Sequence, residues 1–471
     1  MIDIEDVMDK ASTAAAVFSQ YDQSETDRIV EAVYRAGFDA RVSLARHAHE
    51  ETGIGRWEDK VIKNVVATQL VYDDIRDLRT AGIISEDKER GIVEIAQPVG
   101  PILAVIPATN PTSTVLFKVL SALKTRNPVI ISPSRRAVGC SCEAARLCYE
   151  AALEAGAPED CIQWLTEVSR TQTQALMAHP SLALILATGA TSLVHSAYSS
   201  GTPTLGVGPG NVPVFIDVSA DIPFAVNEIC TSKLFDNGTI CASEQAVLVE
   251  QGIAGDVMAA FQARGAYFLT SDEARMLEAV VLDESGHMSA DIVGRSAMDI
   301  AGRAGITVPE GTTLLMARLE GIGDEYPLSR EILAPVLAFY VGESFEAVAE
   351  LCIDLNFYGG IGHTVSLFCN DEARIRAFSM LMNAGRIVVN MPSAQGAVGH
   401  IYNRISPSLT LGCGTGGKNI TTDNVTARHL MNVQRITRRN EDLRFQRFDK
   451  SLYLDERLDS RTIERLYHHN R

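Results

Sequence analysis

The sequence of 471 residues contains no apolar run long enough to span a lipid bilayer. Its apolar segments are short and interrupted, as where Ile102 to Ile106 lies between Pro101 and Pro107. The first ten residues, MIDIEDVMDK, are acidic and lack the apolar run of a secretory signal. The chain also lacks a basic excess, because 42 Lys and Arg stand against 59 Asp and Glu, for a net charge of −17. This balance argues against general binding to nucleic acids or anionic membranes, which need a basic surface.

The nine cysteines form no CxxC pair, and Cys140 and Cys142 are two residues apart, a poor spacing for zinc. An odd number of cysteines without a paired framework indicates reduced thiols, as in the cytoplasm, and we expect no metal site. A chain that is 46% hydrophobic can bury a core without disulfides or metals. Most of the cysteines are therefore expected to be small core residues.

Short apolar strands alternate with helices along the chain, which predicts an α/β fold with a parallel sheet covered on both faces. The first ninety residues are expected to be mostly helical, with Ser24 to Asp27 resembling a capping box. Strands are expected at 102–106, 129–131, 162–165 and 182–186, and helices at 112–124, 141–155 and 171–178. After Gly210 the pattern begins again and continues to about residue 392, with a strand at 214–216, a helix at 222–235 and a strand at 246–249.

The C-terminal segment, residues 434–471, differs in charge from the rest of the chain. It holds ten Lys and Arg against seven Asp and Glu, a net +3, so the preceding part carries −20. A solvated helical tail is the plain interpretation. A docking or subunit-contact segment is the alternative, because the segment also has apolar residues at 452, 454, 458, 463, 466 and 467.

One cysteine stands apart from the others by its surroundings. Cys241 lies in SKLFDNGTICASEQ, residues 232–245, between a turn containing glycine and a run of small residues before a strand. A thiol at such a turn can be exposed, and nearby backbone N–H groups can lower its pKa. A buried, inert thiol is the alternative for any single cysteine.

Around this cysteine the chain resembles the CoA-acylating aldehyde dehydrogenases, including the aldehyde dehydrogenase half of bifunctional aldehyde–alcohol dehydrogenases. The resemblance extends from about residue 95 to 433 and rests on nine motifs in the same order, which are specific together although each alone would be weak. Besides the Cys241 segment, the motifs are IPATNPTST (106–114), LKTRN (123–127), LATG (186–189), LGVGPGNVP (205–213), EILAPV (331–336), GGIGHT (359–364), PSAQG (392–396) and PSLTLGCGT (407–415).

The resemblance implies that Cys241 attacks the aldehyde carbon to form a thiohemiacetal. The oxyanion that results needs preorganised donors, and the backbone N–H of Cys241 and the amide of Asn110 match the family positions that supply them. Asn-Pro is also a common turn, so the Asn110 side chain capping the next helix is the alternative. Transfer of a hydride to nicotinamide then leaves a thioester on Cys241.

The residue at position 206 favours CoA over water as the acceptor of that thioester. Hydrolytic aldehyde dehydrogenases carry a glutamate general base in the segment that matches Leu205-Gly-Val-Gly-Pro-Gly, and Gly206 stands at its place. Without that base, hydrolysis is expected to be slow, whereas a thiol is already partly ionised near neutral pH. His363 matches a histidine common in acylating relatives, and it either assists the CoA thiol or is a packed histidine bonded to backbone.

The resemblance also implies a nicotinamide cofactor. Thr188-Gly-Ala-Thr follows a strand and opens a helix, where N–H groups face a pyrophosphate. Glu331 matches the glutamate that holds the nicotinamide ribose, with a surface carboxylate as the alternative. Arg135 stands where NAD enzymes often have a carboxylate, which favours NADP over NAD, unless Arg135 and Arg136 serve the CoA phosphates or are solvated. The cofactor-binding set is Thr109, Ser132, Ser134, Arg135, Thr188, Gly189, Gly208 and Glu331.

The aldehyde is expected to be small and anionic. Relatives that act on acetaldehyde tend to have an acidic residue where this chain has His400, and a tryptophan where it has Gly416, followed by Gly-Lys418-Asn. The stretch GGKNITTDN resembles acylating sulfoacetaldehyde dehydrogenases, so sulfoacetaldehyde is the first candidate, with His400, Lys418 and Arg404 pairing its anion. Succinate semialdehyde and acetaldehyde are alternatives.

The architecture implied by the resemblance is an aldehyde dehydrogenase fold. It comprises N-terminal helices and a cofactor-binding α/β domain (1–220), a catalytic α/β domain (221–405) and a segment (406–471) that returns to the first domain and forms an oligomerisation arm and a charged tail. A homodimer or homotetramer is expected, cytoplasmic or in a bacterial microcompartment if the first twenty residues are an encapsulation helix and not an ordinary one. A non-acylating dehydrogenase, a scaffold without activity and glutamate-5-semialdehyde dehydrogenase are the competing interpretations.

Overall fold

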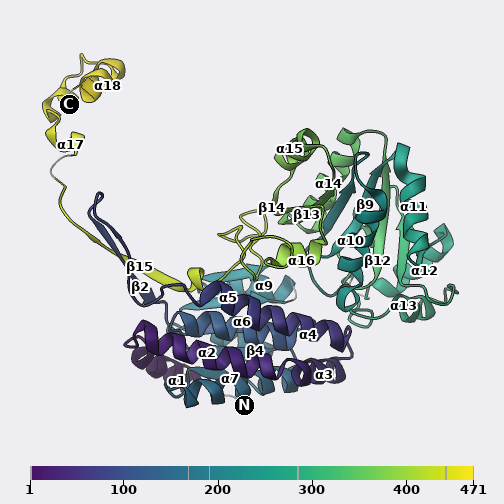
Figure 1. Ribbon diagram of the computed structural model, residues 1–471, viewed down its shortest axis with the longest axis horizontal. Helices are drawn as coiled ribbons and strands as arrows, with labels where there is room; N and C mark the ends of the chain where they lie inside the picture. Colours follow the sequence, from purple (N-terminus) through teal and green to yellow (C-terminus); the bar gives the residue numbers. More distant parts are fainter. Residues whose placement is uncertain (1–2, 168, 190, 284–285, 441–442, 470–471) are drawn as a thin grey trace.

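The computed structural model describes residues 3–167, 169–189, 191–283, 286–440 and 443–469. Two α/β units lie side by side, and a narrow three-stranded sheet projects from the first of them (Figure 1). Both large sheets are parallel throughout, which confirms the predicted fold class.

The first unit contains a five-stranded sheet in the order β5-β4-β3-β6-β7. Its strands are β3 (Ile102–Ile106), β4 (Val129–Pro133), β5 (Ile162–Trp164), β6 (Leu184–Thr188) and β7 (Thr204–Val207). The helices between them are α6 (Pro111–Lys124), α7 (Val138–Glu154), α8 (Arg170–Met177) and α9 (Thr191–Tyr198). The predicted strands and helices are confirmed within three residues at each end. The order reverses between β3 and β6, the kind of position where open parallel sheets bind ligands beyond the carboxyl ends of their strands.

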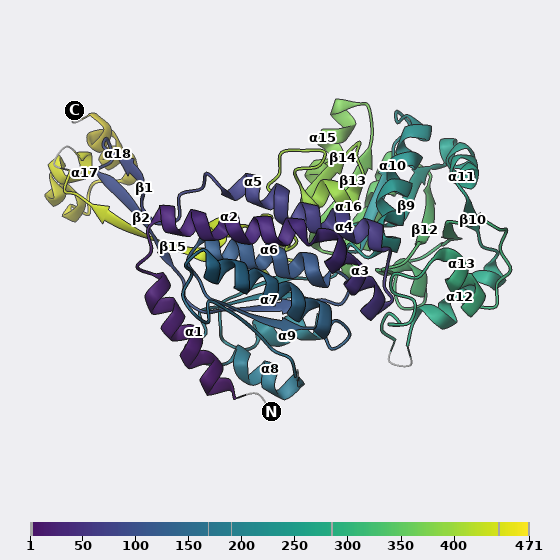
Figure 2. The same cartoon turned by 60° about the horizontal axis from the view of Figure 1, so that its bottom comes forward.

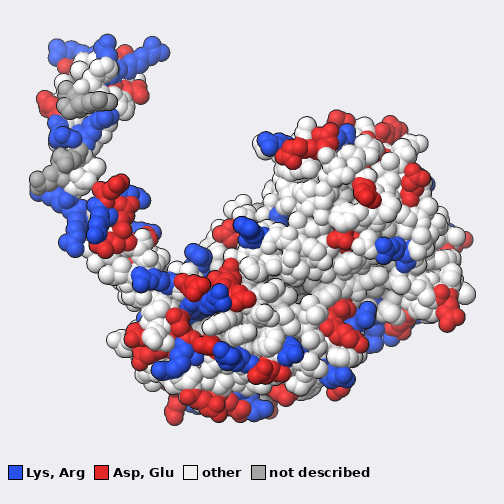
Figure 3. Space-filling view, viewed as in Figure 1, with Lys and Arg blue, Asp and Glu red and all other residues white. Residues whose placement is uncertain are grey.

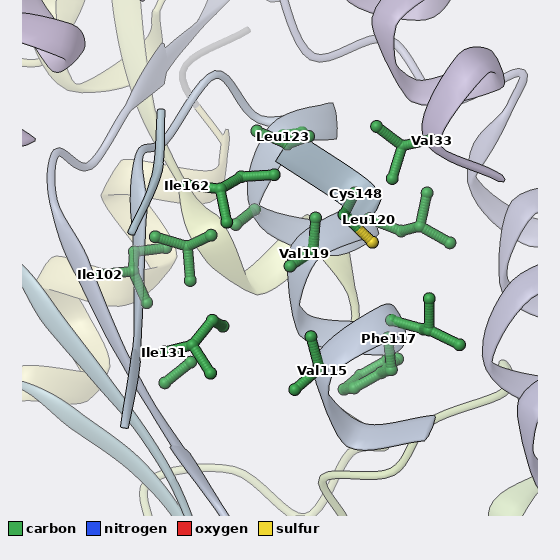
Figure 4. Packing of buried hydrophobic residues seen from close by; sticks show 14 of the residues in the cluster. Val33, Ile102, Val115, Phe117, Val119, Leu120, Leu123, Ile131, Cys148 and Ile162 are labelled. Atoms are coloured by element: carbon green, nitrogen blue, oxygen red, sulfur yellow. The ribbon is translucent and has the colours of Figure 1, made fainter. Parts of the chain in front are cut away.

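Helix α6 is the central element of this unit, since every one of its residues is buried. Val115, Val119 and Leu123 pack toward Ile102 and Ile131 of the sheet (Figure 4). On its other side, Phe117 and Leu120 of the same helix lie near Val33 of α2 and Cys148 of α7. The N-terminus of α6, at Asn110, is therefore held on a rigid element.

The N-terminal residues form a row of helices over this unit, as expected. They are α1 (Ile4–Phe18), α2 (Gln23–Asp39), α3 (Arg41–Thr52), α4 (Trp57–Val65), a π-helical turn η1 (Val66–Leu70) and α5 (Val71–Ile75). The capping box of α2 uses Asp22 and Glu25, not Ser24 and Asp27, because Asp22 is the extended residue that precedes the helix. Helix α1 packs Met8, Ala11 and Phe18 onto the body and lies beside α8 (Figure 2). Its apolar face is thus already occupied within the chain.

The second unit contains a seven-stranded sheet in the order β10-β11-β12-β9-β8-β13-β14. The strands are β8 (Val212–Ile216), β9 (Glu244–Glu250), β10 (Ala266–Phe268), β11 (Leu314–Arg318), β12 (Val336–Gly342), β13 (Gly362–Phe368) and β14 (Ala384–Val389). Its helices are α10 (Ile222–Leu234), α11 (Ala254–Ala263), α12 (Ser271–Val281), α13 (Ala297–Arg303), α14 (Phe345–Gly359), α15 (Glu372–Leu381) and α16 (Ser393–Val398), with 3-10 turns η2 (Phe235–Gly238), η3 (Gln251–Ile253) and η4 (Pro327–Ser329). Because β8 belongs to this sheet, the chain passes into the second unit before residue 212 and not at the predicted boundary of 220.

The projecting sheet is antiparallel and joins β1 (Gly82–Asp87), β2 (Ile92–Pro98) and β15 (Met431–Thr437). After η5 (Ala427–Leu430), β15 leads to the short elements α17 (Arg444–Arg447), η6 (Lys450–Leu454) and α18 (Ser460–His469), which stand away from the body in both views (Figures 1 and 2). The tail is therefore not helical from its start, since residues 434–437 belong to a strand, where Arg435 Nε donates to Glu94 at 3.0 Å. Phe448 is buried against Tyr453 and Tyr467, and the rest of this segment is largely exposed.

Acidic and basic side chains are interspersed over the face of the body shown in Figure 3, while Lys and Arg are prominent on the projecting segment. Within the residues that the structure describes, we find no helix that combines the length and the apolar composition needed to cross a membrane.

Candidate active site

Cys241 follows a turn whose backbone is held in an unusual conformation. Asp236, Asn237 and Gly238 all have positive φ angles, of 49°, 52° and 75°. A Cβ at Gly238 would lie 2.9 Å from the carbonyl oxygen of Ala334, so only glycine fits there without a shift. This turn carries the chain from α10 to Cys241 and on into β9. All nine cysteines are free thiols, and only Cys142 and Cys241 are partly exposed.

The Cys241 thiol lies in a pocket where the two units meet. It is formed by the start of α6, the ends of β6 and β7, the end of α16 and the loop that follows residue 406. The lining residues are Lys63, Asn110, Thr114, Thr188, Val207, Ile240, Cys241, Val398, Ser408, Leu409 and Leu411. The structure thus brings together three residues that are far apart in sequence and were predicted to act together: Asn110, Thr188 and Cys241. Pockets of this kind, apolar with a few polar groups, are the usual form of a small-molecule site.

The resting Cys241 is a thiol and not an activated thiolate. Burial raises its pKa to about 12, and the neighbouring Glu331 adds to the effect. The sequence-based expectation that the turn lowers this pKa is therefore wrong for the protein alone, because the apolar walls and a nearby carboxylate outweigh the backbone N–H. Ionisation of Cys241 requires either a change of surroundings when ligands bind or transfer of the proton during attack.

Two hydrogen bonds hold the amide of Asn110 at the N-terminus of α6. Its Oδ1 accepts a hydrogen bond from Lys63 Nζ at 2.6 Å, and its Nδ2 donates to Thr109 Oγ1 at 3.1 Å. Asn110 is the N-cap residue of α6, but its side chain makes no capping hydrogen bond. The alternative role as a helix cap is thereby excluded. An Asn amide has two N–H groups, so one remains to face the pocket while the other contacts Thr109.

Glu331 is partly buried near Cys241 and is not a surface carboxylate. Its Oε1 accepts a hydrogen bond from the backbone N–H of Gly210 at 2.9 Å. Burial raises the pKa of Glu331 to about 7, although the Gly210 N–H and Lys233 oppose the change. Its carboxyl group therefore changes charge near neutral pH, within the field felt by the Cys241 thiol.

We expect Glu331→Gln to increase the rate at which iodoacetamide alkylates Cys241 above pH 7. Glu331 is charged above its pKa of about 7, and its negative charge disfavours the thiolate. Removing it should raise the rate roughly three- to tenfold at pH 8, with little change at pH 6, where the wild-type carboxyl is protonated. Mass spectrometry of the Cys241 peptide measures the rate, and Glu320→Gln, an exposed carboxylate, is the control. Equal rates at pH 8 would contradict the coupling.

His363 is fully buried beside the backbone that carries Cys241. A Cβ built on Gly210 would lie 2.0 Å from the carbonyl oxygen of Cys241 and 3.3 Å from Cε1 of His363, so the three are neighbours. Burial, with the Arg386 charge, lowers the pKa of His363 to about 3, and the ring is neutral. Nδ1 lies 2.9 Å from Thr364 Oγ1, while Nε2 has no hydrogen-bond partner among the described residues. The histidine is bonded to a side chain and not to backbone, and it retains one free nitrogen.

A side chain at Gly206 of β7 would require two neighbouring side chains to shift. A Cβ there would lie 2.7 Å from Tyr198 Oη and 2.9 Å from Val194 Cγ1. The carbonyl oxygen of Gly206 also accepts a hydrogen bond from Asn419 Nδ2 at 2.5 Å. Side chains from α9 and the loop after residue 406 therefore contact the strand at the position where a hydrolytic relative would place its base.

The strand ends of the first unit carry the residues expected to hold the cofactor. Thr188 ends β6 and lines the pocket, and its Oγ1 is buried without a hydrogen-bond partner among the described residues. Gly189 follows with a φ of 158°, and α9 begins at Thr191, which confirms the strand–turn–helix arrangement. Ala190 lies outside the described residues. An orphaned hydroxyl at this place fits a ligand with phosphate or ribose oxygens.

The end of β4 holds the other group of expected cofactor residues. Ser132 is buried, Ser134 is partly buried, and Arg135 and Arg136 are exposed. Arg136 donates to the carbonyl oxygen of Ala290 at 3.0 Å, so it bridges to the second unit.

Two other expected cofactor residues lie elsewhere in the first unit. Thr109 accepts a hydrogen bond at its carbonyl oxygen from Lys60 at 3.0 Å. Gly208 lies partly buried in the loop after β7, with open space at its Cβ.

A carboxylate does lie at the start of α7, close to residues 132–136, although that segment itself contains none. Glu51 of α3 accepts hydrogen bonds from the N–H groups of Gly139 and Cys140, at 2.8 and 2.7 Å, at the start of α7. Burial acts to raise the pKa of Glu51, but hydrogen bonds from the Cys140 thiol and from the two N–H groups outweigh it and lower the pKa, so Glu51 is charged. Residues 132–136 alone could not predict Glu51, because it comes from a helix about eighty residues earlier in the chain.

The three cations expected to bind a substrate anion lie apart from the pocket lining. His400, Arg404 and Lys418 are all exposed, and none is among the residues that line the pocket in the described part of the chain. Lys63 is the cation that does line it. The assignment of His400, Arg404 and Lys418 to an anion stays a prediction from sequence.

Three further functional candidates were not predicted from the sequence: Lys60 and Lys63 from helix α4, and Asp236 from the turn before Cys241. Lys60 and Lys63 of α4 are buried and both contact Asp236 Oδ2, Lys60 at 3.0 Å. The spacing of three residues places the two lysines on one helix face, which is the only trace of this arrangement in the sequence.

The chain is similar to known proteins over nearly its whole length. A model described as the aldehyde dehydrogenase family matches residues 2–277. The chain is 42% identical over 451 residues to the bifunctional aldehyde-alcohol dehydrogenase AdhE of Escherichia coli K12, covering 95% of this chain and 50% of that protein. It is 34% identical to a succinate-semialdehyde dehydrogenase (acetylating) of Clostridium kluyveri, covering 95% and 98%, and 36% identical to a sulfoacetaldehyde dehydrogenase (acylating) of Bilophila wadsworthia, covering 91% and 94%. The chain thus spans about half the length of the bifunctional relative and nearly all of the other two.

Solved structures show the same fold over almost the whole chain. An acetylating aldehyde dehydrogenase from Geobacillus thermoglucosidasius is 45% identical, with a TM-score of 0.91 over 93% of this chain and 97% of that one. A propionaldehyde dehydrogenase from Rhodopseudomonas palustris, with bound CoA and an acylated cysteine, is 26% identical, with a TM-score of 0.83 over 92% and 97%.

Proposed function

The chain belongs to the aldehyde dehydrogenase family, and we propose that it oxidises a small aldehyde to its CoA thioester with a nicotinamide cofactor. The observation that carries the proposal is a pocket that combines Cys241 with Asn110, while Gly206 stands where a hydrolytic relative has the glutamate that activates water. The relatives named as acetylating or acylating support the same reaction class.

The residues of the pocket suit each step of this reaction. The Cys241 sulfur adds to the aldehyde carbon, the carbonyl π electrons move to the aldehyde oxygen, and the thiol proton passes to solvent as the C–S bond forms. The negative charge that develops on the aldehyde oxygen is stabilised by the Asn110 amide and the backbone N–H of Cys241. Thr188 and Glu331 would hold a nicotinamide cofactor, which would supply the acceptor for the hydride that leaves the same carbon, so that a thioester would remain on Cys241.

The second half-reaction transfers the acyl group to CoA. The CoA sulfur attacks the thioester carbon, a new C–S bond forms, and Cys241 leaves as the thiolate that regains a proton. The neutral His363, whose Nε2 has no hydrogen-bond partner among the described residues, is the candidate acceptor of the CoA proton. Its pKa of about 3 makes it a weak base in the protein alone, so this role requires the surroundings of the ring to change when CoA binds. Its buried position beside Gly210 places the ring close to the Cys241 backbone.

The pocket lining favours a small, uncharged aldehyde such as acetaldehyde. Val207, Val398, Leu409 and Leu411 supply apolar walls, and the three N–H groups of Lys63 already have acceptors. A sulfoacetaldehyde or succinate semialdehyde substrate is the second candidate, supported by the GGKNITTDN stretch and by the two acylating relatives that act on anionic aldehydes.

The expected cofactor is NADP, since Arg135 is exposed at the end of β4 and can reach a 2′-phosphate. The charged Glu51 at the start of α7 opposes this preference, because it adds negative charge at the same edge of the sheet. NAD is therefore the alternative.

The test is an assay of NAD(P)H formation with and without CoA. We expect formation with acetaldehyde to be slow without CoA after the first turnover, and to become continuous when CoA is added. Steady turnover without CoA would overturn the acylating assignment. The same assay with sulfoacetaldehyde, and with NAD and NADP, decides the substrate and cofactor by kcat/KM, and a preference for sulfoacetaldehyde would replace the first substrate candidate by the second.

A further inference from the structure

Lys63 makes three hydrogen bonds that join the two segments bearing the expected oxyanion donors. Its Nζ donates to Asn110 Oδ1 at 2.6 Å, to Thr239 Oγ1 at 2.8 Å and to Asp236 Oδ2. Lys63 is 4% exposed, and an ammonium group has only three hydrogens. All of its donor capacity is therefore used inside the protein.

The hydrogen bond from Lys63 to Asn110 fixes the orientation of the Asn110 amide. Because an ammonium group can only donate, it can face the amide oxygen and not the amide nitrogen. Lys63 thus fixes Oδ1 on its own side and directs Nδ2 the other way, where one N–H reaches Thr109 Oγ1. A charged donor on Oδ1 also withdraws electron density from the amide and makes its N–H groups stronger donors.

The other two contacts hold the turn that leads to Cys241. Asp236 and Thr239 lie five and two residues before Cys241, and Thr239 Oγ1 donates to Asp236 Oδ2 at 2.8 Å. Asp236 Oδ1 accepts the backbone N–H of Arg56 at 2.6 Å, and a Cβ on Gly55 would lie 1.9 Å from that oxygen. Gly55 therefore lets the chain before α4 approach the turn closely.

We infer that Lys63 is a positioning residue of the proposed reaction, which sets the distance and orientation between the Asn110 amide and the backbone N–H of Cys241. The inference rests on the proposed function for the role of those two donors. Lys63 donates no hydrogen bond to the aldehyde or the cofactor in this role, since its three N–H groups all go to protein acceptors. It acts by hydrogen bonding, through its Nζ, to both the start of α6 and the turn before Cys241.

The charge of Lys63 is maintained by its neighbours at neutral pH. The ionisable groups facing it are Asp59 and Lys60 of its own helix and Asp236 of the turn. Burial and the Lys60 charge lower the pKa of Lys63 to about 8, against the pull of Asp236. The ammonium form, which all three hydrogen bonds require, thus predominates below that pH.

The test is a double-mutant cycle in the full-length protein. We expect Lys63→Met to lower kcat for aldehyde oxidation roughly 10- to 100-fold with the aldehyde KM little changed, and Asn110→Ala to lower it roughly 100-fold. If Lys63 acts through Asn110, adding Lys63→Met to Asn110→Ala should cost about threefold at most. Losses that multiply fully would overturn the inference. Lys63→Gln is the second variant if the methionine variant does not fold.

A merely structural role is distinguished by two further measurements. Alkylation of Cys241 by iodoacetamide forms no oxyanion, so its rate should be nearly the same in Lys63→Met and wild type, and a parallel loss of alkylation and turnover would contradict the positioning role. Lys60→Met is the matched control, because Lys60 contacts Asp236 at 3.0 Å and the Thr109 backbone but not Asn110. Its loss of kcat should be smaller and should persist in the Asn110→Ala background.

Failure of the inference and failure of the proposed function give different results. If the wild type forms no NAD(P)H from any small aldehyde with CoA, the proposed function fails and the cycle has no reference. If the wild type is active and the Lys63 and Asn110 losses are independent, only the role of Lys63 fails.

Discussion

Replacing Cys241 with alanine is expected to abolish NAD(P)H formation from aldehyde and CoA, lowering kcat by at least about 10⁴-fold. Without the sulfur there is no thiohemiacetal from which a hydride can leave, and a methyl group in the pocket cannot substitute. The fold should survive, because Cys241 is only partly buried and the turn before it is held by Asp236 and Gly238. The midpoint of thermal unfolding measures this second expectation.

Cys142→Ala is the matched control, since Cys142 is the other partly exposed cysteine and lies away from the pocket, with its Sγ 3.8 Å from the carbonyl oxygen of Leu165. It should keep wild-type turnover. Intact-mass analysis provides an independent reading, because wild type incubated with aldehyde and oxidised cofactor but no CoA should gain one acyl group on Cys241. Turnover retained in Cys241→Ala, or an acyl group found on another residue, would show that the nucleophile lies elsewhere.

The regular elements of both units follow from local patterns in the sequence. Buried parallel strands are continuous apolar runs, so β3, β4 and β6 could be placed from Ile, Leu and Val alone, and α6 from its helical spacing. The projecting sheet could not be placed that way. Strand β15 has a mostly exposed, polar surface, and its partner β2 lies more than three hundred residues earlier. The pairing that makes residues 434–437 a strand is a tertiary contact that local propensity does not express.

The candidate site divides in the same way. Cys241, Asn110 and Thr188 could be named because motifs around them resemble a known family, and the structure lines one pocket with all three. Lys63 and Glu51 lie in no motif, and Asp236 lies in the Cys241 motif without any sign there of its partners; each contacts a residue about fifty or more positions away. The pKa of Cys241 was also beyond local reasoning, because it depends on walls supplied by both units and on the carboxylate of Glu331.

Asp236→Ala is expected to destabilise the protein by about 3–5 kcal/mol, because it leaves two buried ammonium groups without their shared carboxylate. Asp236 is fully buried, and both Lys60 and Lys63 contact its Oδ2. The midpoint of thermal unfolding should fall by roughly 3–5 °C. Glu372→Ala removes one partner of an exposed ion pair with Arg376, at 3.0 Å, and should leave the midpoint nearly unchanged.

The dependence of this loss on pH tests its cause. Asp236 raises the pKa of Lys63, so without it the folded-state pKa of that lysine falls further below about 8, while the unfolded chain keeps an ordinary lysine value. At pH values between the folded-state and unfolded-state pKa of Lys63, the unfolded protein binds more protons than the folded protein. The stability of Asp236→Ala should therefore rise with pH relative to wild type. The difference in midpoint should therefore be larger at pH 6 than at pH 9. A loss that is equal at both values would mean that packing of the turn, and not the two buried charges, accounts for the effect.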